Sequence, residues 1–248
     1  MSRFRVRTRS EAKDGATDTG DDRVAWAIAP DGSFRAALAD GVSNSISPGQ
    51  WADALVQGFI GGAIAPGTRR TDILKWERGL AAVFAPTVPH LAQQPLWLAN
   101  RLAAEGSHAT FVGVTISKHG RRWRWQAVAI GDSCVFVLDA SGAIERVFPI
   151  RKVSGFTAVP DTLSSRPRSG TWTSRWYRTG GWFPSGATLL LLSDALARWV
   201  LRAGALDAAS ELVRASRNAR RFSDTVSRLR SARELENDDA TILMVSHR

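Results

Sequence analysis

The fold is decided by the stretch Phe34-Arg35-Ala36-Ala37-Leu38-Ala39-Asp40-Gly41-Val42-Ser43-Asn44, where an apolar run ends abruptly in an acid and a glycine. A short apolar run bounded by small or polar residues is typical of a buried β-strand. The turn sequence Pro30-Asp31-Gly32 separates it from another apolar run and predicts a hairpin. Asp21 and Asp22 precede this hairpin and Asp40 follows it, so we expect all three acids at one end.

Three further apolar runs carry acids at their ends. One ends in Gly131-Asp132-Ser133, another ends in Ser193-Asp194, and Asn237-Asp238-Asp239 directly precedes the third. If a strand that begins with an acid lies antiparallel to strands that end in one, these acids meet at one edge of a sheet. Carboxylates repel at close range, so a shared site needs a cation. Oxygen ligands without His or Cys favour a hard divalent ion such as Mg²⁺ or Mn²⁺.

The order of the remaining elements predicts an α+β fold of antiparallel sheets. Helices are expected as a block after the first strands, without the alternation of strand and helix that parallel sheets need. The predicted helices are 48–60, 72–84, 95–105, 196–203, 206–215 and 222–229, and the predicted strands are 4–8, 24–29, 34–39, 108–117, 122–140, 144–150, 188–192 and 240–245. We expect one domain over residues 1–248. Within it, the polar and irregular segment 151–185 is expected to be an insertion near the site, since long loops tend to be functional.

Composition limits the class of protein. Lys and Arg number 33 against 23 Asp and Glu, a net charge of +10, which favours anionic partners without choosing among nucleic acid, phosphoprotein and lipid. The alternative is that arginines merely replace lysines on solvated faces. The one cysteine, Cys134, is expected to be a buried thiol and suits a reducing compartment. The start lacks a secretory signal and no apolar stretch approaches the roughly 20 residues of a membrane span, so a cytoplasmic protein is expected.

Other chemistries lack their sequence patterns. The four histidines, His90, His108, His119 and His247, have no ligand spacing, and we interpret them as structural or surface residues. The chain contains no Gly-x-Ser-x-Gly motif and no glycine-rich phosphate loop with a lysine, which argues against a serine hydrolase and a nucleotide-driven enzyme.

Six short motifs also carry a resemblance to a known family. In chain order they are Gly20-Asp21-Asp22-Arg23, Ala39-Asp40-Gly41, Gly106-Ser107-His108-Ala109-Thr110, Gly131-Asp132-Ser133, Ser193-Asp194-Ala195-Leu196 and Asp238-Asp239-Ala240-Thr241. Together they resemble the bacterial form of the metal-dependent (PPM-type) protein phosphatase 2C family, from about Ser10 to Val245. The resemblance implies a sandwich of two antiparallel β-sheets flanked by α-helices. It also implies a serine/threonine phosphatase that hydrolyses phosphoserine and phosphothreonine through a water bridging two Mn²⁺ or Mg²⁺ ions.

The resemblance also implies roles for individual residues. Asp40 matches the acid that bridges the two ions, and the carbonyl of Gly41 would bind the second ion. Asp194 and Asp238 match further ligands of the first ion, while Asp22 matches the acid that holds water on the second. The remaining implied roles are phosphate binding by Lys13, a weak third-ion ligand at Asp132, and support of the ligands by Asp21 and Asp239.

The chain departs from the family pattern at several positions. Gly20 and Asp239 stand where Asn is usual, and Ala195 stands where Gly is usual, which fits only if its φ is negative. No arginine lies at 16–19 to hold phosphate, so Lys13 is the nearest cation. Arg198 replaces a common acid and argues against a third ion; if it points inward, it would pair with Asp132.

Three functions remain open from the sequence. The first is the phosphatase, acting on phosphoproteins that include a cognate Ser/Thr kinase or its substrates in bacterial signalling. The second is a catalytically weak pseudophosphatase that binds phosphoproteins or partners. The third, a nucleic-acid binder, is disfavoured, and no membrane partner is expected.

The segment 151–185 bears on this choice because arginines alternate there with aromatic residues. We predict that Arg166, Arg168, Arg175 and Arg178 steer phosphopeptides toward the metal site. The same composition, with Trp172, Trp176, Tyr177 and Trp182, also suits single-stranded nucleic acid. A third possibility is that the tryptophans only pack and the arginine heads are solvated.

Overall fold

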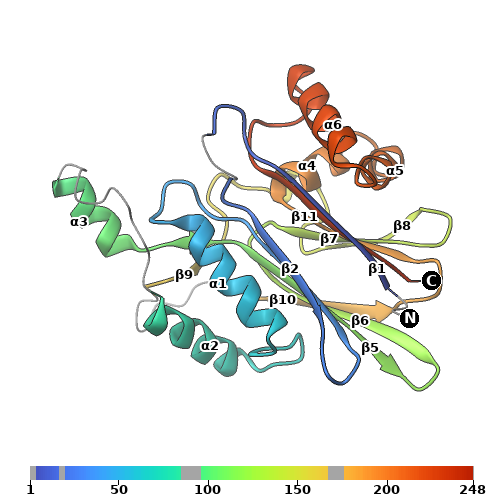
Figure 1. The fold of residues 1–248 in the computed structure, drawn as a ribbon, viewed down its shortest axis with the longest axis horizontal. Helices are drawn as coiled ribbons and strands as arrows, with labels where there is room; N and C mark the ends of the chain where they lie inside the picture. The colour runs from blue at the N-terminus through green and yellow to red at the C-terminus, as the bar shows by residue number, and fades with distance from the viewer. Residues whose placement is uncertain (1–3, 17–19, 85–95, 167–175, 248) are drawn as a thin grey trace.

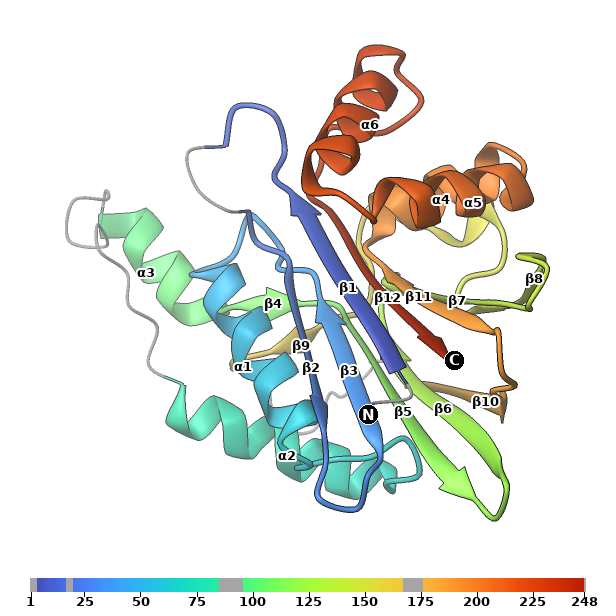
Figure 2. The same ribbon diagram turned by 45° about the vertical axis from the view of Figure 1, so that its right-hand side comes forward.

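The computed structural model describes residues 4–16, 20–84, 96–166 and 176–247, and in it two antiparallel sheets pack face to face with helices on both outer faces (Figures 1 and 2). The first sheet has the strand order β1 (Phe4–Glu11), β12 (Ala240–His247), β11 (Thr188–Leu192), β7 (Cys134–Leu138), β8 (Ile144–Phe148). The second has the order β10 (Tyr177–Trp182), β6 (Arg122–Ile130), β5 (Phe111–His119), β3 (Phe34–Ala39), β2 (Arg23–Ile28). A small third sheet pairs β4 (His108–Ala109) with β9 (Leu163–Ser164). The predicted α+β sandwich is therefore confirmed.

The helices cover the two sheets as separate groups. The second sheet carries α1 (Pro48–Ile60), beside α2 (Arg70–Val83), and α3 (Leu96–Glu105) follows in the chain. The first sheet carries α4 (Asp194–Arg202), α5 (Ala205–Ala215) and α6 (Ala219–Ser231), and a 3₁₀ turn, η2 (Val153–Gly155), lies against α4. No helix among the described residues is long and apolar enough to cross a membrane.

Burial of apolar side chains explains the sandwich. Alternate residues of the strands, such as Val112 and Val114 on β5 and Leu189 and Leu191 on β11, fill the space between the sheets. Outside, the predicted amphipathic face of α1 buries Leu55 and its neighbours against the second sheet. Each such large apolar side chain contributes about 1.5–3 kcal/mol to folding when buried.

Several predicted boundaries were wrong. The largest error concerns the segment 151–185, because its end forms the edge strand β10 instead of loop. The sequence Tyr177-Arg-Thr-Gly-Gly-Trp182 has two glycines that weaken strand propensity, but Gly180 allows close pairing, since a Cβ there would lie 2.8 Å from the carbonyl oxygen of Trp125. The run 122–140 is two strands, β6 and β7, separated at Asp132, and α4 begins at Asp194 itself.

Candidate active site at the acidic end of the sandwich

Strand register brings the predicted acids to one end. Arg23 pairs with Ala39, so Asp22, just before β2, lies beside Asp40, just after β3. In the other sheet, Leu192 pairs with both Cys134 and Ile242. Asp132, Asp194 and the pair Asp238-Asp239 lie within four residues of these three positions along the chain. The acids therefore meet as predicted, but at one end of the sandwich, with contributions from two sheets, and not along the edge of a single sheet.

Burial and mutual repulsion raise the pKa of the central carboxyl groups. Burial raises the pKa of Asp40 well above its usual range, and the charges of Asp22 and Asp194 add to this shift. Burial raises the pKa of Asp22 to about 8, helped by the charges of Asp239, Asp194 and Asp238 and opposed by the Thr241 hydroxyl. At this end of the sandwich the ionised carboxylates repel one another, and a bound cation would stabilise them.

The carboxyl groups of Asp194 and Asp132 share this environment. Burial, followed by the charges of Asp132 and Asp238, raises the pKa of Asp194 to about 7. Asp194 is the first residue of α4, where it also accepts a hydrogen bond from the backbone N–H of Ala195 at 2.6 Å. Burial raises the pKa of Asp132 to about 6. Ala195 lies inside the helix with negative φ, so its replacement of the usual glycine causes no backbone strain.

These residues fit a hard divalent cation. Both carboxylate oxygens of Asp22 are buried, and apart from the nearby Thr241 hydroxyl they have no hydrogen-bonding partner among the described residues, an arrangement that is costly unless a cation binds there. The surrounding ligand atoms are oxygens, which Mg²⁺ and Mn²⁺ prefer. Within the described ranges, no three His, Cys, Asp or Glu side chains are close enough to form a complete metal-ligand group. The fit therefore rests on the unpartnered, repelling carboxylates.

Asp239 fastens the loop that carries Asp21 and Asp22. Its carboxylate accepts hydrogen bonds from the backbone N–H groups of Lys13 at 2.9 Å and Asp22 at 3.4 Å, and a further bond from Asp21. Gly20, with φ of 76°, is required beside it, because a Cβ there would lie 2.5 Å from the Asp239 carboxylate. Asp239 therefore holds the backbone on both sides of Gly20 in place.

Two side chains for which the sequence predicted no role hold this end together. The hydroxyl of Ser193 donates to the carbonyl of Asp239 at 3.2 Å and accepts from the N–H of Thr241 at 2.9 Å, which ties β11 to β12. On α6, the buried Arg230 donates to the carbonyls of Ala12 at 2.9 Å and Asp238 at 2.5 Å. It also donates to the carboxylate of Asp14 at 2.9 Å.

The helical spacing of the sequence could have identified Arg230 as a buried residue. It lies four residues after the buried Val226, so helical spacing places it on the apolar face of α6. A cation on such a face needs a buried acceptor. Ser193 gave no comparable signal, because a serine before a helix is an ordinary N-terminal residue.

The motif from Gly106 to Thr110 braces the loop after Asp40. Thr110 donates its N–H to the carbonyl of Asp40 at 2.9 Å, and His108 donates its N–H to the hydroxyl of Ser45 at 3.1 Å. Gly41 allows a close approach of chain to chain, since a Cβ there would lie 2.7 Å from the backbone of Pro48. The motif therefore fixes the position of Asp40.

Lys13 lies on the rim of the acidic end. Its ammonium donates to the hydroxyl of Ser43 at 2.7 Å, and this hydroxyl donates to Asp21 at 3.2 Å. Ser43 is exposed and Lys13 and Asp21 are partly exposed, so they can meet an incoming anion. The structure thus brings Lys13 and Asp21 together at the surface, above the buried acids.

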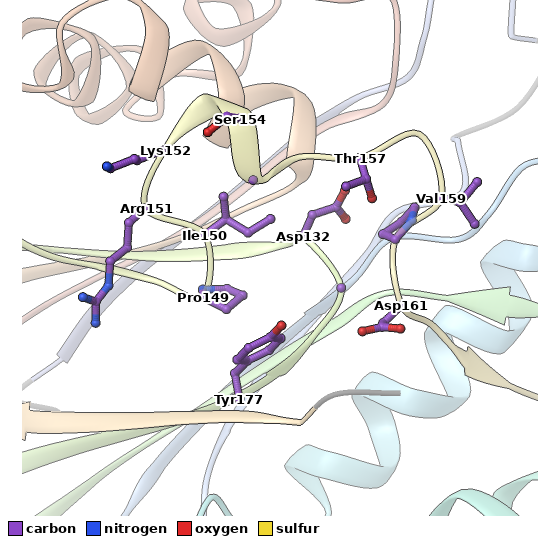
Figure 3. A pocket seen from close by; sticks show the side chains of 13 residues that line it. Asp132, Pro149, Ile150, Arg151, Lys152, Ser154, Thr157, Val159, Asp161 and Tyr177 are labelled. Atoms are coloured by element: carbon purple, nitrogen blue, oxygen red, sulfur yellow. The ribbon is translucent and has the colours of Figure 1, made fainter. Parts of the chain in front are cut away.

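A cavity of about 600 Å³ opens beside Asp132 (Figure 3). Its lining comes from the β6–β7 connection, the segment 149–161 and Tyr177 at the start of β10. Figure 3 shows Asp132 in the middle, with Arg151 and Lys152 to one side and Asp161 opposite. These two cations belong to the segment predicted to steer substrates.

Arg198 does not pair with Asp132 as the sequence suggested. Its guanidinium instead makes two hydrogen bonds to the carboxylate of Glu236, at 2.6 and 2.7 Å, and stacks over the ring of Phe156 at 5.1 Å. An acidic partner on the neighbouring loop is thus favoured over the buried carboxyl group. The charge of Arg198 still lowers the pKa of Asp132, against the larger effect of burial.

The other predicted substrate-binding arginines are dispersed. Arg166 is exposed and packs against Gly106. Arg178 donates to the carbonyl of Thr68, on the helix-covered side of the second sheet. Arg168 and Arg175, with Trp172, lie outside the described residues.

The aromatic residues and histidines have structural contacts. Trp176 packs against Phe111, with 6.4 Å between ring centroids, whereas Trp182 is exposed beneath Arg122. The ring of His108 hydrogen-bonds Thr162 and the carbonyl of Glu105. His247 stacks on Phe183, His119 is exposed, and His90 lies outside the described residues. Cys134 is buried, as predicted, and burial raises its pKa above the usual value.

Known proteins share this architecture but little sequence. No family model and no curated protein matches the sequence. Among solved structures, the S. agalactiae serine/threonine phosphatase aligns with a TM-score of 0.62 and 12% identity over 99% of this chain and 100% of that one. The photosystem II phosphatase PBCP gives 0.60 and 14% over 99% of each chain. The M. tuberculosis serine/threonine phosphatase PstP/Ppp gives 0.57 and 17% over 98% of each. The chain therefore has the fold of the bacterial serine/threonine phosphatases.

Proposed function

We propose that the chain is a metal-dependent protein serine/threonine phosphatase. The observation that carries the proposal is the cluster of mutually repelling carboxyl groups at one end of the sandwich, centred on the buried Asp22 and the half-buried Asp40. The fold likeness to phosphatases supports it. The substrates proposed are phosphoserine and phosphothreonine proteins, including a cognate kinase or its targets.

The residues that would hold two Mn²⁺ or Mg²⁺ ions are Asp22, Asp40, the carbonyl of Gly41, Asp194 and Asp238. Such ions, when bound, activate water for attack on phosphorus and neutralise charge on the phosphate. Asp132 remains a candidate ligand of a third ion, which we expect to bind weakly or not at all because Arg198 stands where an acid is common.

The chain's own residues would supply orientation. Asp239, Arg230 and Ser193 hold the two segments that carry the acids. Lys13 is the exposed cation placed to meet a phosphate at the rim, and its bond to Ser43 orients it there. Arg151 and Lys152 would attract the rest of an anionic substrate toward the cavity beside Asp132.

A hydrolysis assay tests the proposal. Wild-type protein should hydrolyse an aryl phosphate and a phosphoserine peptide with Mn²⁺ and lose this activity in chelator. Asp40→Asn should lower kcat by orders of magnitude while the circular dichroism spectrum is retained. Asp139→Asn is the matched control, because Asp139 lies in a distant exposed turn. Activity that survives chelation, or an unaffected Asp40→Asn variant, would refute the proposal.

A catalytically weak pseudophosphatase is the second candidate. The observation that favours it is the absence of an arginine at 16–19, which leaves Lys13, already bonded to Ser43, as the nearest cation for phosphate. This candidate predicts phosphopeptide binding without turnover at any Mn²⁺ concentration. Equilibrium binding measured beside the hydrolysis assay separates the two functions.

A further inference from the structure

A row of arginines lines one face of β1. Arg5, Arg7 and Arg9 alternate with Phe4 and Val6, which pack between the sheets. The arginines therefore face the opposite way, toward the side that carries α4, α5 and α6. The register agrees, because Arg7 lies opposite Met244 and Arg9 opposite Ile242, and both partners belong to the core beneath those helices.

These arginines have no acidic partner. Among the described residues, no carboxylate forms an ion pair with Arg5, Arg7, Arg9 or the nearby Arg217. Burial, then the charges of Arg5, Arg217 and Arg9, lower the pKa of Arg7. Two acids of the adjoining helices pair with other arginines, Glu211 with Arg228 and Asp224 with Arg220. Glu11 ends the row on the same strand face.

The inner row of β1 borders an apolar shelf. Trp26 and Ile28 of β2 lie on the face that looks into the sandwich, because they pair with Ala36 and Phe34 of the inner core. Both are nevertheless about half exposed, at 46% and 50%. Phe34 connects the shelf to β1, with ring centroids 6.0 Å from Trp26 and 5.3 Å from Phe4.

The strand itself lies at the margin of the molecule. β1 ends the strand order of its sheet, and it is the next strand, β12, that packs against β2. Figure 2 shows β1 facing the viewer, with none of the drawn helices crossing in front of it. An edge strand presents backbone N–H and C=O groups that can pair with another chain.

We propose that β1 accepts, as an added strand, an extended segment of a partner protein that alternates acidic and apolar residues. Its acidic side chains would lie opposite Arg5, Arg7 and Arg9, at the ~4.5–5.5 Å of cross-strand neighbours. Its apolar side chains would cover Trp26 and Ile28. The edge supplies the backbone hydrogen bonds that such strand addition uses.

An added strand of this kind accounts for the arginine row, the exposed apolar side chains of β2 and the open edge of β1 together. The arginine row and an added strand share the same two-residue period, and carboxylates accept paired hydrogen bonds from guanidinium groups. A nucleic acid would use the arginines and Trp26 but leave the backbone edge unpaired. A second copy of this chain, paired through its own β1, would place arginine against arginine. The inference does not depend on the proposed catalytic function.

Fluorescence anisotropy with labelled peptides tests the proposal. The probe is an eight-residue peptide of alternating Glu and Val, and its control has the same composition with the glutamates and valines in separate blocks. We expect the alternating peptide to bind the full chain at least tenfold more tightly than the block peptide. Alternate backbone amides of the bound peptide point toward β1, and the others point away from it. N-methylation of the set that points toward β1 should abolish binding, whereas methylation of the other set should not. In hydrogen exchange, the β1 amides should become protected.

Variants of the chain complete the test. Arg5→Glu with Arg7→Glu should weaken binding of the alternating peptide at least tenfold, and Trp26→Ser should weaken it several-fold. Lys118→Glu with Arg121→Glu changes the charge equally at an exposed hairpin and should have little effect. Arg5→Gln with Arg7→Gln replaces the reversal variant if that one fails to fold.

Any of three positive binding results would overturn the inference. They are equal binding of the block peptide, tighter binding of a single-stranded oligonucleotide than of the alternating peptide, and binding indifferent to Arg5 and Arg7. Absence of binding to every probe would also overturn it, and would assign the arginines to protection of the edge against aggregation.

Discussion

At the scale of the residue, Asp239 does more than an asparagine could do in its place. Its two carboxylate oxygens accept backbone hydrogen bonds from three residues of the loop between β1 and β2. Asp239→Ala should destabilise the protein by about 1–3 kcal/mol, because buried N–H groups lose their acceptor. Asp239→Asn keeps one oxygen and should cost less. Urea unfolding measures both variants; an alanine variant as stable as wild type would contradict this role.

Arg230 gives a second prediction at this scale. Arg230→Met should weaken Mn²⁺ binding and destabilise the fold by about 1–3 kcal/mol, since two carbonyls at the site lose a buried donor. Arg228→Met is the matched control on the same helix. Arg228 makes an exposed ion pair with Glu211, worth no more than ~1 kcal/mol. Calorimetric Mn²⁺ titration and urea unfolding should separate the two variants, and equal effects would refute the assignment.

The carboxylates of the site were predictable residue by residue, and their supports were not. Asp22, Asp40 and Asp194 stand at the ends of apolar runs, a local pattern that needs no tertiary information. Asp239 and Arg230 both bind residues of the loop after β1, which lie more than 200 residues away in the sequence. No local sequence pattern can identify such partners. The partner of Arg198 was predicted wrongly for the same reason, because Glu236 lies on a loop whose path depends on α6.

At the scale of the element, the segment after β8 divides into parts with different roles. Arg151 and Lys152 line the cavity beside Asp132, whereas Arg178 is bonded to Thr68 on the helix-covered side of the second sheet. Arg151→Gln with Lys152→Gln should raise KM for an acidic phosphopeptide several-fold and leave aryl phosphate hydrolysis nearly unchanged. Arg178→Gln should leave both KM values unchanged. Equal KM changes in the two variants would contradict this division.

Periodicity explains which elements the sequence predicts well. The helix α1 and the strands β3 and β11 follow simple apolar patterns and were located within a residue or two. The strand β10 contains two adjacent glycines, and its pairing with β6 comes from the close approach that they permit. That approach is a property of the folded sheet and leaves no periodic signal.

At the scale of the whole molecule, the acidic end should link stability to pH. Folding raises the pKa of Asp22 to about 8 and of Asp194 to about 7, above the ~3.9 of an unfolded aspartate. The folded, metal-free protein therefore binds more protons than the unfolded chain between these values, and its stability falls as pH rises from about 4 to about 8. We expect Tm without metal to fall by about 5–10 °C across this window.

Added Mn²⁺ should reverse this trend at neutral pH, because a cation bound only to the folded state raises Tm. The variant Asp22→Asn removes one repelling charge and should flatten the pH dependence of the metal-free protein. Scanning calorimetry at several pH values measures both effects. A metal-free Tm that rises from pH 5 to pH 8 would contradict the assigned pKa directions.

The central claim is that the carboxylates of Asp22, which is buried, and of Asp40 and Asp194, which are half-buried, form a divalent cation site. Anomalous diffraction from crystals of the full chain grown with Mn²⁺ tests it most directly, because it locates the ions without any assumption about activity. We predict anomalous peaks among these three carboxylates, with no such peaks in Asp40→Asn crystals. Mn²⁺ found only at exposed surface acids, with none among these three carboxylates, would contradict the claim.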